Sequence, residues 1–140
     1  MKKKATIYIL GTQYVDDDKD SVELTTEGEF CKKNDSYFLT YCEDELSGIK
    51  GSKTTIKIDS DKKAMIMKGG RFSSTLIIEP EKRNLCGYET EFGDLLFGIS
   101  DCDIYCNFSE NGGEAKLKYT LDVNNEQVSR NELDIKVRLN

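Results

Sequence analysis

The chain has 140 residues, of which 37% are hydrophobic and 33% are charged, and its formal net charge is −6 at pH 7. This composition is typical of one globular domain that buries its own core, and it excludes a disordered chain. The negative charge argues against nucleic acid and anionic lipid as partners, and no apolar run approaches the ~20 residues of a membrane-spanning helix.

The first segment, residues 2–13, begins with three lysines that resemble the basic region of a signal peptide. The apolar stretch that follows is short and contains Thr6 and Tyr8. No small-residue cleavage site precedes the acidic residues 16–18. We therefore predict that this segment is the first strand of a cytoplasmic protein.

Later segments alternate between apolar and polar residues with a period of two, which predicts half-buried antiparallel strands. The alternation is clearest in residues 22–30, 86–92, 115–123 and 133–139. Turn-forming residues separate the strands at Asn34-Asp35, Asp59-Ser60-Asp61, Gly69-Gly70, Pro80, Asn111-Gly112-Gly113 and Asn124-Asn125. No segment has the apolar period of a helix, so little helix is expected beyond one short turn near Leu46.

The connections between these strands are short, which favours an antiparallel up-and-down meander. A long meander is most stable when it closes on itself, because closure removes exposed edge strands. The sequence therefore predicts an all-β barrel of about eight to ten strands in a single domain, residues 1–140. A barrel of that size is filled by side chains or holds one small ligand.

An ordered set of motifs runs along most of the chain. It comprises Gly11-Thr12-Gln13, ELTTEGEF at 23–30, YFLTYCEDELSGIKGSKTTIKI at 37–58, GYETEFGD at 87–94 and KLKYTLDVNNEQVSRNELDIKV at 116–137. With these motifs the chain resembles the YwiB-like family of small bacterial proteins of unknown function, also called DUF1934. The family tends to carry an Arg-x-Gly element where this chain has Lys68-Gly69-Gly70-Arg71. The resemblance implies a calycin-like barrel, similar in shape to lipocalins, and no known activity.

Residues 41–58 combine three carboxylates, Glu43, Asp44 and Glu45, with glycines and a strand-like segment. On a strand, Glu43 and Glu45 would share a face and could act in acid–base chemistry or bind a hard cation. The alternative is a wide hairpin at a barrel rim, whose charged tip is solvated. We favour the hairpin.

Five cysteines are present, and the sequence has neither histidine nor a C-x-x-C pair. An odd number of cysteines fits reduced thiols in a cytosol, so we predict five free thiols and no bound metal. Cys102 and Cys106 would lie about 13 Å apart on a regular strand, too far for a disulfide. Cys86, Cys102 and Cys106 are expected to point inward, packed with Tyr88, Ile104 and Phe108.

Catalytic equipment is scarce, because there is no imidazole for general base catalysis and no phosphate-binding loop. We therefore expect a non-enzymatic protein without a cofactor, whose barrel binds a small apolar or amphipathic molecule. The inward aromatic candidates for contact with that ligand are Phe30, Tyr41, Tyr88, Phe97 and Tyr119. The small inward residues Thr26, Gly28 and Ala115 are expected to leave room for it.

The alternative function is a protein–protein interaction module that uses the charged outer surface. Residues 14–30 hold seven acidic groups and one basic group, residues 47–75 hold seven basic and two acidic, and residues 86–115 hold seven acidic and none basic. A basic panel for an anionic ligand or partner would consist of Lys50, Lys53, Lys57, Lys68 and Arg71. The competing interpretation, which we favour, is charge pairing between neighbouring strands.

Overall fold

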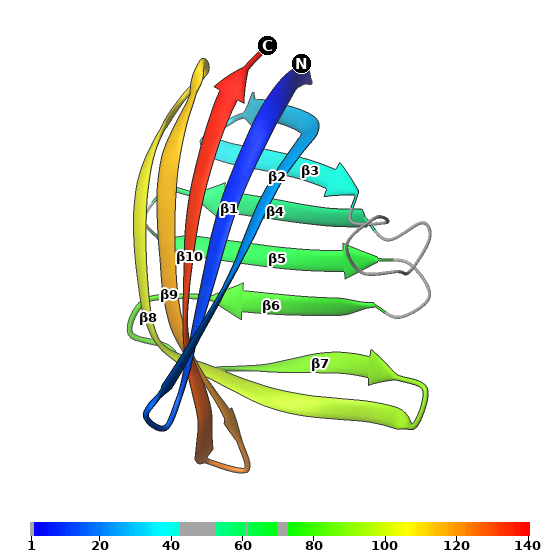
Figure 1. Ribbon diagram of the computed structural model, residues 1–140, viewed down its shortest axis with the longest axis vertical. Coiled ribbons are helices and arrows are strands. Elements are labelled where there is room, and N and C mark those ends of the chain that lie inside the picture. The colour runs from blue at the N-terminus through cyan, green and yellow to red at the C-terminus, as the bar shows by residue number, and fades with distance from the viewer. Residues whose placement is uncertain (1, 43–52, 61, 70–72) are drawn as a thin grey trace.

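The computed structural model describes residues 2–42, 53–60, 62–69 and 73–140, which form ten strands and no helix (Figure 1). The strands are β1 (Lys3–Val15), β2 (Asp18–Lys33), β3 (Ser36–Cys42), β4 (Lys53–Asp59), β5 (Lys63–Gly69), β6 (Ser74–Ile78), β7 (Asn84–Thr90), β8 (Gly93–Ser109), β9 (Gly112–Val123) and β10 (Glu126–Leu139). Each strand pairs with its sequence neighbours, and β1 pairs with β10, so the sheet closes into an antiparallel barrel. The predicted up-and-down barrel is confirmed.

The barrel has two walls that are joined by the bent strand β8. Figure 1 shows β1, β2, β9 and β10 running across the direction of β3–β6. The pairing of β8 with β9 shifts register between Ser100 and Asp103, where Asp101 has a positive φ of 49°. A β-bulge of this kind bends a strand and increases its twist. The bend allows β8 to belong to both walls. No helix in the described part of the chain is long and apolar enough to cross a membrane.

The hairpin turns coincide with the polar pairs that the sequence marks. Asn34, Ser60, Asn124 and Asn125 all have positive φ between 54° and 68°, a conformation that tight hairpins need. The turn between β1 and β2, where Asp16 has a φ of 53°, was not among the predicted turns.

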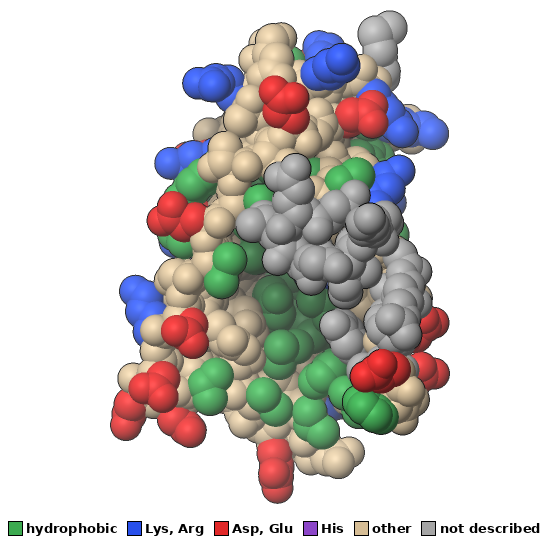
Figure 2. Space-filling model, turned by 45° about the vertical axis from the view of Figure 1, so that its right-hand side comes forward, with side chains coloured by type: hydrophobic (Ala, Val, Ile, Leu, Met, Phe, Trp, Pro, Cys, Tyr) green, Lys and Arg blue, Asp and Glu red, His purple; other side chains and the backbone are tan. Residues whose placement is uncertain are grey.

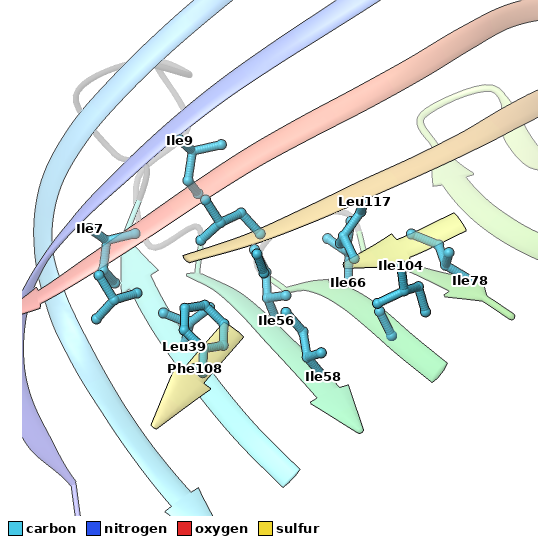
Figure 3. Packing of buried hydrophobic residues seen from close by; sticks show 14 of the residues in the cluster. Ile7, Ile9, Leu39, Ile56, Ile58, Ile66, Ile78, Ile104, Phe108 and Leu117 are labelled. Atoms are coloured by element: carbon cyan, nitrogen blue, oxygen red, sulfur yellow. The ribbon is translucent and has the colours of Figure 1, made fainter. Parts of the chain in front are cut away.

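Alternation places one apolar face of every strand inside the barrel. Figure 3 shows aliphatic side chains from both walls meeting in the core, among them Ile7, Leu39 and Leu117. One end of the barrel is closed by rings. Phe30 lies 6.0 Å from the Tyr37 ring and 5.5 Å from the Phe108 ring, centroid to centroid, and the Tyr37 hydroxyl donates to the Phe108 carbonyl at 3.0 Å.

The contact between β6 and β7 is the weakest between neighbouring strands of the described barrel. Ser74 and Tyr88 are their one ladder pair, whereas β5 and β6 have five. A backbone N–H of Ile77 donates instead to the Cys86 sulfur at 3.3 Å. The described residues of β6 and β7 therefore form fewer ladder pairs than those of β5 and β6.

All five cysteines are free thiols, as predicted. Cys86 is buried in the core, and Cys102 and Cys106 are half-buried against it on the inner face of β8. Burial raises the pKa of the Cys86 and Cys102 thiols, so these two sulfurs stay protonated and unreactive at neutral pH. Cys42 at the end of β3 is exposed.

A bidentate ion pair ties the start of β7 to β9 across β8. The Arg83 guanidinium donates to the two Asp122 carboxylate oxygens at 2.6 and 3.2 Å. Gly98 of β8 lies between them, and a Cβ at that position would come within 2.4 Å of Arg83 and 2.5 Å of Asp122. The hydrogen bonds from Arg83 lower the pKa of Asp122.

Asp122→Asn is expected to lower the melting temperature most at neutral pH. Because the Asp122 pKa is lower in the folded chain than in the unfolded chain, ionised Asp122 stabilises the fold above the ordinary aspartate pKa of about 3.9. That contribution is lost as the pH falls through the folded-state pKa. Melting curves between pH 7 and pH 3 should show the difference from wild type shrinking with acidification. The control, Asp94→Asn, removes an exposed carboxylate and should change little. A difference that persists unchanged at low pH would contradict this account.

Candidate binding cavity

An apolar cavity of about 390 Å³ lies between the two walls, away from the aromatic closure. Figure 2 shows hydrophobic side chains gathered in a recess of the molecular surface. One wall contributes Ile9, Gly11, Val22, Leu24, Tyr119 and Leu133, and the other contributes Tyr41, Ile56, Ile66, Lys68 and Leu76. All of these side chains occupy the inward phase of their strands, so the cavity is the unfilled end of the barrel interior.

Strand register arranges the β3–β6 wall in three cross-strand rows on its inner face. The row at the closed end is Tyr37, Ile58, Ala64 and Ile78, the middle row is Leu39, Ile56, Ile66 and Leu76, and the outermost row is Tyr41, Thr54, Lys68 and Ser74. We call the outermost row the polar rim. The wall therefore changes from apolar to polar within one step along each strand.

The first half of β2 contributes Val22 and Leu24 to the cavity. Within the described residues, β2 pairs with β1 from Asp18 onward and with β3 from Gly28 onward. The inward-phase Val22 in the first half of β2 is 71% exposed, and Leu24 is half-buried. Apolar side chains at the mouth are therefore left partly uncovered by the residues that the structure describes.

Tyr119 brings a phenol to the cavity from β9. Its side chain is largely desolvated, and this burial raises its pKa to about 12. The phenol is therefore neutral at physiological pH and offers one O–H donor. No hydrogen bond of this hydroxyl is formed with another residue of the described ranges.

Comparison with known proteins places the chain in a family. The family model described as "Domain of unknown function (DUF1934)" matches residues 7–135. The chain belongs to the DUF1934 family. A solved structure with the same fold, entitled "Crystal structure of ywiB protein from Bacillus subtilis", superposes with a TM-score of 0.70 at 16% identity, covering 96% of this chain and 92% of that one. No curated protein matches. The resemblance inferred from the motifs is confirmed for the family and for an antiparallel barrel.

The predicted aromatic residues do not form one site in this DUF1934 barrel. Tyr41 and Tyr119 line the cavity. Phe30 is 1% exposed and belongs to the aromatic closure at the other end of the barrel. Phe97 is half-buried on β8, where it lies opposite Cys86 of β7. The side chain of Tyr88 lies outside what the structure describes. The aliphatic lining and Gly11 were not predicted as site residues, although their inward phase was visible in the sequence.

The expectation that Gly28 leaves room for a ligand is wrong. A Cβ at Gly28 would lie 2.3 Å from the Thr40 carbonyl oxygen and 2.8 Å from Ile7 Cδ1. Gly28 is small because neighbouring groups already occupy the space. Among the described residues, the glycine that lines the cavity is Gly11, where an added Cβ would meet Leu133 at an ordinary 3.4 Å.

The proposed basic panel is divided between the two faces of the sheet. Lys53 and Lys57 lie on the outer face of β4, and Lys57 lies 3.9 Å from Asp59. Lys68 lies on the inner face of β5 at the cavity. Lys50 and Arg71 lie outside the described residues. Cross-strand charge pairing is present on β9 and β10, where Lys116 pairs with Asp134 and Lys118 pairs with Glu132.

The hairpin interpretation of residues 41–58 is confirmed for its two strands. β3 and β4 are antiparallel neighbours, and Cys42 pairs with Lys53. Glu43, Asp44 and Glu45, like the short turn expected near Leu46, lie outside the described residues. Within the described ranges, no three histidine, cysteine, aspartate or glutamate side chains group as a metal site.

Proposed function

We propose that this protein is a non-enzymatic binding protein of the bacterial cytoplasm, and that its calycin-like barrel takes up a small apolar or amphipathic molecule. The observation that carries this proposal is the cavity of about 390 Å³ between the two walls. Ligand pockets usually measure about 300–1,000 Å³, with mainly apolar walls and a few placed polar groups. This cavity has that composition, since the polar rim and Tyr119 stand among aliphatic side chains.

Uncovered apolar surface at the mouth supports the same proposal. Val22 is 71% exposed, and Leu24, Leu76 and Leu133 are only half-buried despite their inward phase. Covering apolar surface gains about 25 cal/mol per Å². An apolar molecule in the cavity would complete the burial that the strands leave unfinished.

Two further features support the non-enzymatic role and the cytoplasmic location that we propose. They are the absence of histidine from the sequence and the five free thiols. A thiol nucleophile would lack its usual imidazole partner. Free thiols fit a reducing compartment.

Gly11→Leu is expected to weaken the binding of Nile red, a neutral apolar dye, at least tenfold relative to wild type. Gly11 lines the cavity, and an added Cβ meets only ordinary contacts, so the longer side chain extends into the ligand space without breaking the sheet. Fluorescence titration measures the affinity. Native mass spectrometry of the purified protein would also detect a ligand carried over from the cell.

The matched control is Gly87→Leu on β7, where an added Cβ meets nothing within 4 Å. It adds the same side chain away from the cavity and should leave the dye affinity unchanged. Equal binding by wild type and Gly11→Leu, or no binding by wild type, would refute the proposal.

A second candidate, protein–protein interaction, is supported by the hairpin of β7 and β8. Leu85, Phe92 and Leu96 on this hairpin are 62%, 92% and 64% exposed, and exposed apolar patches of this kind often mark interaction sites. The surrounding charges are acidic, at Glu89, Glu91 and Asp94, so the surface differs from the basic one that the sequence suggested. The cavity is the better-supported site, because its lining converges from both walls of the barrel.

A further inference from the structure

The polar rim is a row of four hydrogen-bonding side chains, of which Tyr41 and Lys68 line the cavity. Register pairs Tyr41 with Thr54, Thr54 with Lys68, and Lys68 with Ser74, on the consecutive strands β3 to β6. Side chains directly opposite each other in a sheet lie about 4.5–5.5 Å apart at Cβ. The rim is thus a continuous band of three hydroxyls and one ammonium, next to an aliphatic row.

Among the described residues that line the cavity, Lys68 is the charged one, and none of them carries a carboxylate. Its ammonium makes no ion pair within the part of the chain that the structure describes. The positive charge therefore favours an anionic group at the polar rim over a neutral or cationic one.

Thr54 supplies the second observation. Its side chain is 0% exposed, and its hydroxyl has no hydrogen-bond partner in the described structure. Both rim neighbours of this hydroxyl, Tyr41 and Lys68, line the cavity. Buried polar groups are normally satisfied, and each exception requires a reason. A ligand oxygen that enters between Tyr41 and Lys68 provides the acceptor that the hydroxyl lacks.

We propose that the polar rim binds the carboxylate of an amphipathic acid, whose apolar tail lies in the cavity. This inference rests on the proposed function and adds a head-group class and an orientation to it. A carboxylate only accepts hydrogen bonds, and its two oxygens match the ammonium of Lys68 and the hydroxyl of Thr54 as donors. One cation balances one negative charge, which fits a carboxylate better than a doubly charged phosphate.

The test uses three ligands with the same tail, decanoic acid, decanol and decyltrimethylammonium, which compete with Nile red for the protein. Decanoic acid should displace the dye from wild type about tenfold more tightly than decanol, the gain of one hydrogen bond to a charged group. The cationic ligand should be the weakest. Decyl phosphate serves as a fourth arm and should not exceed decanoic acid.

Lys68→Met should reduce the ratio of the affinity for decanoic acid to the affinity for decanol to about one. Lys53→Met is the matched control, because Lys53 lies on the outer face of the neighbouring strand, and it should keep the wild-type ratio. Thr54→Val, which is nearly isosteric, should weaken the binding of decanoic acid about threefold relative to that of decanol. It also replaces the unsatisfied hydroxyl, so the fold should not be destabilised.

The possible outcomes distinguish failure of the carboxylate site from failure of the proposed binding function. Equal displacement by decanoic acid and decanol, or an unchanged ratio in Lys68→Met, overturns the carboxylate site and leaves an apolar binding protein. Failure of both tails to displace bound dye, or failure of the dye to bind, overturns the proposed function and the inference with it.

Discussion

Phe30→Ala is expected to lower the free energy of unfolding by about 3–5 kcal/mol, the usual cost of truncating a buried phenylalanine. Phe30 is 1% exposed, and its ring packs against Tyr37 and Phe108 at centroid distances of 6.0 and 5.5 Å. These rings come from β2, β3 and β8, so the cavity left by the substitution would loosen the closed end of the barrel. Urea denaturation followed by intrinsic tyrosine fluorescence measures the change.

Phe92→Ala removes the same atoms from a side chain that is 92% exposed, and it should change the free energy of unfolding by less than about 0.5 kcal/mol. The comparison also decides the role of Phe30, which the sequence placed among the ligand-contacting residues. A Phe30→Ala protein of normal stability with lost dye binding would show that Phe30 contacts a ligand and is not part of the closure.

The barrel itself was predictable because the alternation of apolar and polar residues in each strand indicates which side chains face the interior. Residues at alternate positions of β9, such as Ala115 and Leu117, are buried as the period of two requires. The same rule fails at the end of this strand, where Val123 is exposed and Asp122 is buried. Asp122 is buried because Arg83 covers it, and a contact between residues that far apart in sequence leaves no local pattern.

The cavity was less predictable than the barrel. Inward phase identifies every residue of the interior, but it does not show which of them pack together and which line a space. That division depends on the stagger of distant strands, as where the described part of β3 pairs with β2 from Gly28 onward. Aromatic rings were therefore expected at a ligand, whereas Phe30 fills the closed end and aliphatic residues such as Leu24 and Leu133 line the cavity.

The charge of Lys68 and its position in the strand predict different locations for its side chain. Lys68 was grouped with Lys53 and Lys57 because of its charge. Its position two residues after Ile66 and four after Ala64 gives it the phase of buried residues, and the structure places it at the cavity, where its side chain is exposed. A lysine at an apolar position of the alternation, near the end of a strand, can therefore be recognised from the sequence as a residue of the inner face.

Gly28→Ala is expected to lower the free energy of unfolding by about 1–3 kcal/mol or more, the range for adding atoms to a packed interior. A Cβ at this position would lie 2.3 Å from the backbone oxygen of Thr40, which cannot rotate away as a side chain can. β2 and β3 must then separate at Gly28, which lies opposite Tyr41. Because Tyr41 lines the cavity, the affinity for Nile red should fall together with stability.

Gly87→Ala is the matched control for Gly28→Ala. Both glycines lie in strands, but an added Cβ at Gly87 meets no atom within 4 Å. Replacing glycine where its backbone is compatible with alanine reduces the freedom of the unfolded chain and stabilises a protein by about 0.4–1 kcal/mol. The two substitutions should therefore shift the urea midpoint in opposite directions. Equal midpoints for the two variants would mean that β2 and β3 do not approach each other at Gly28 as closely as the structure shows.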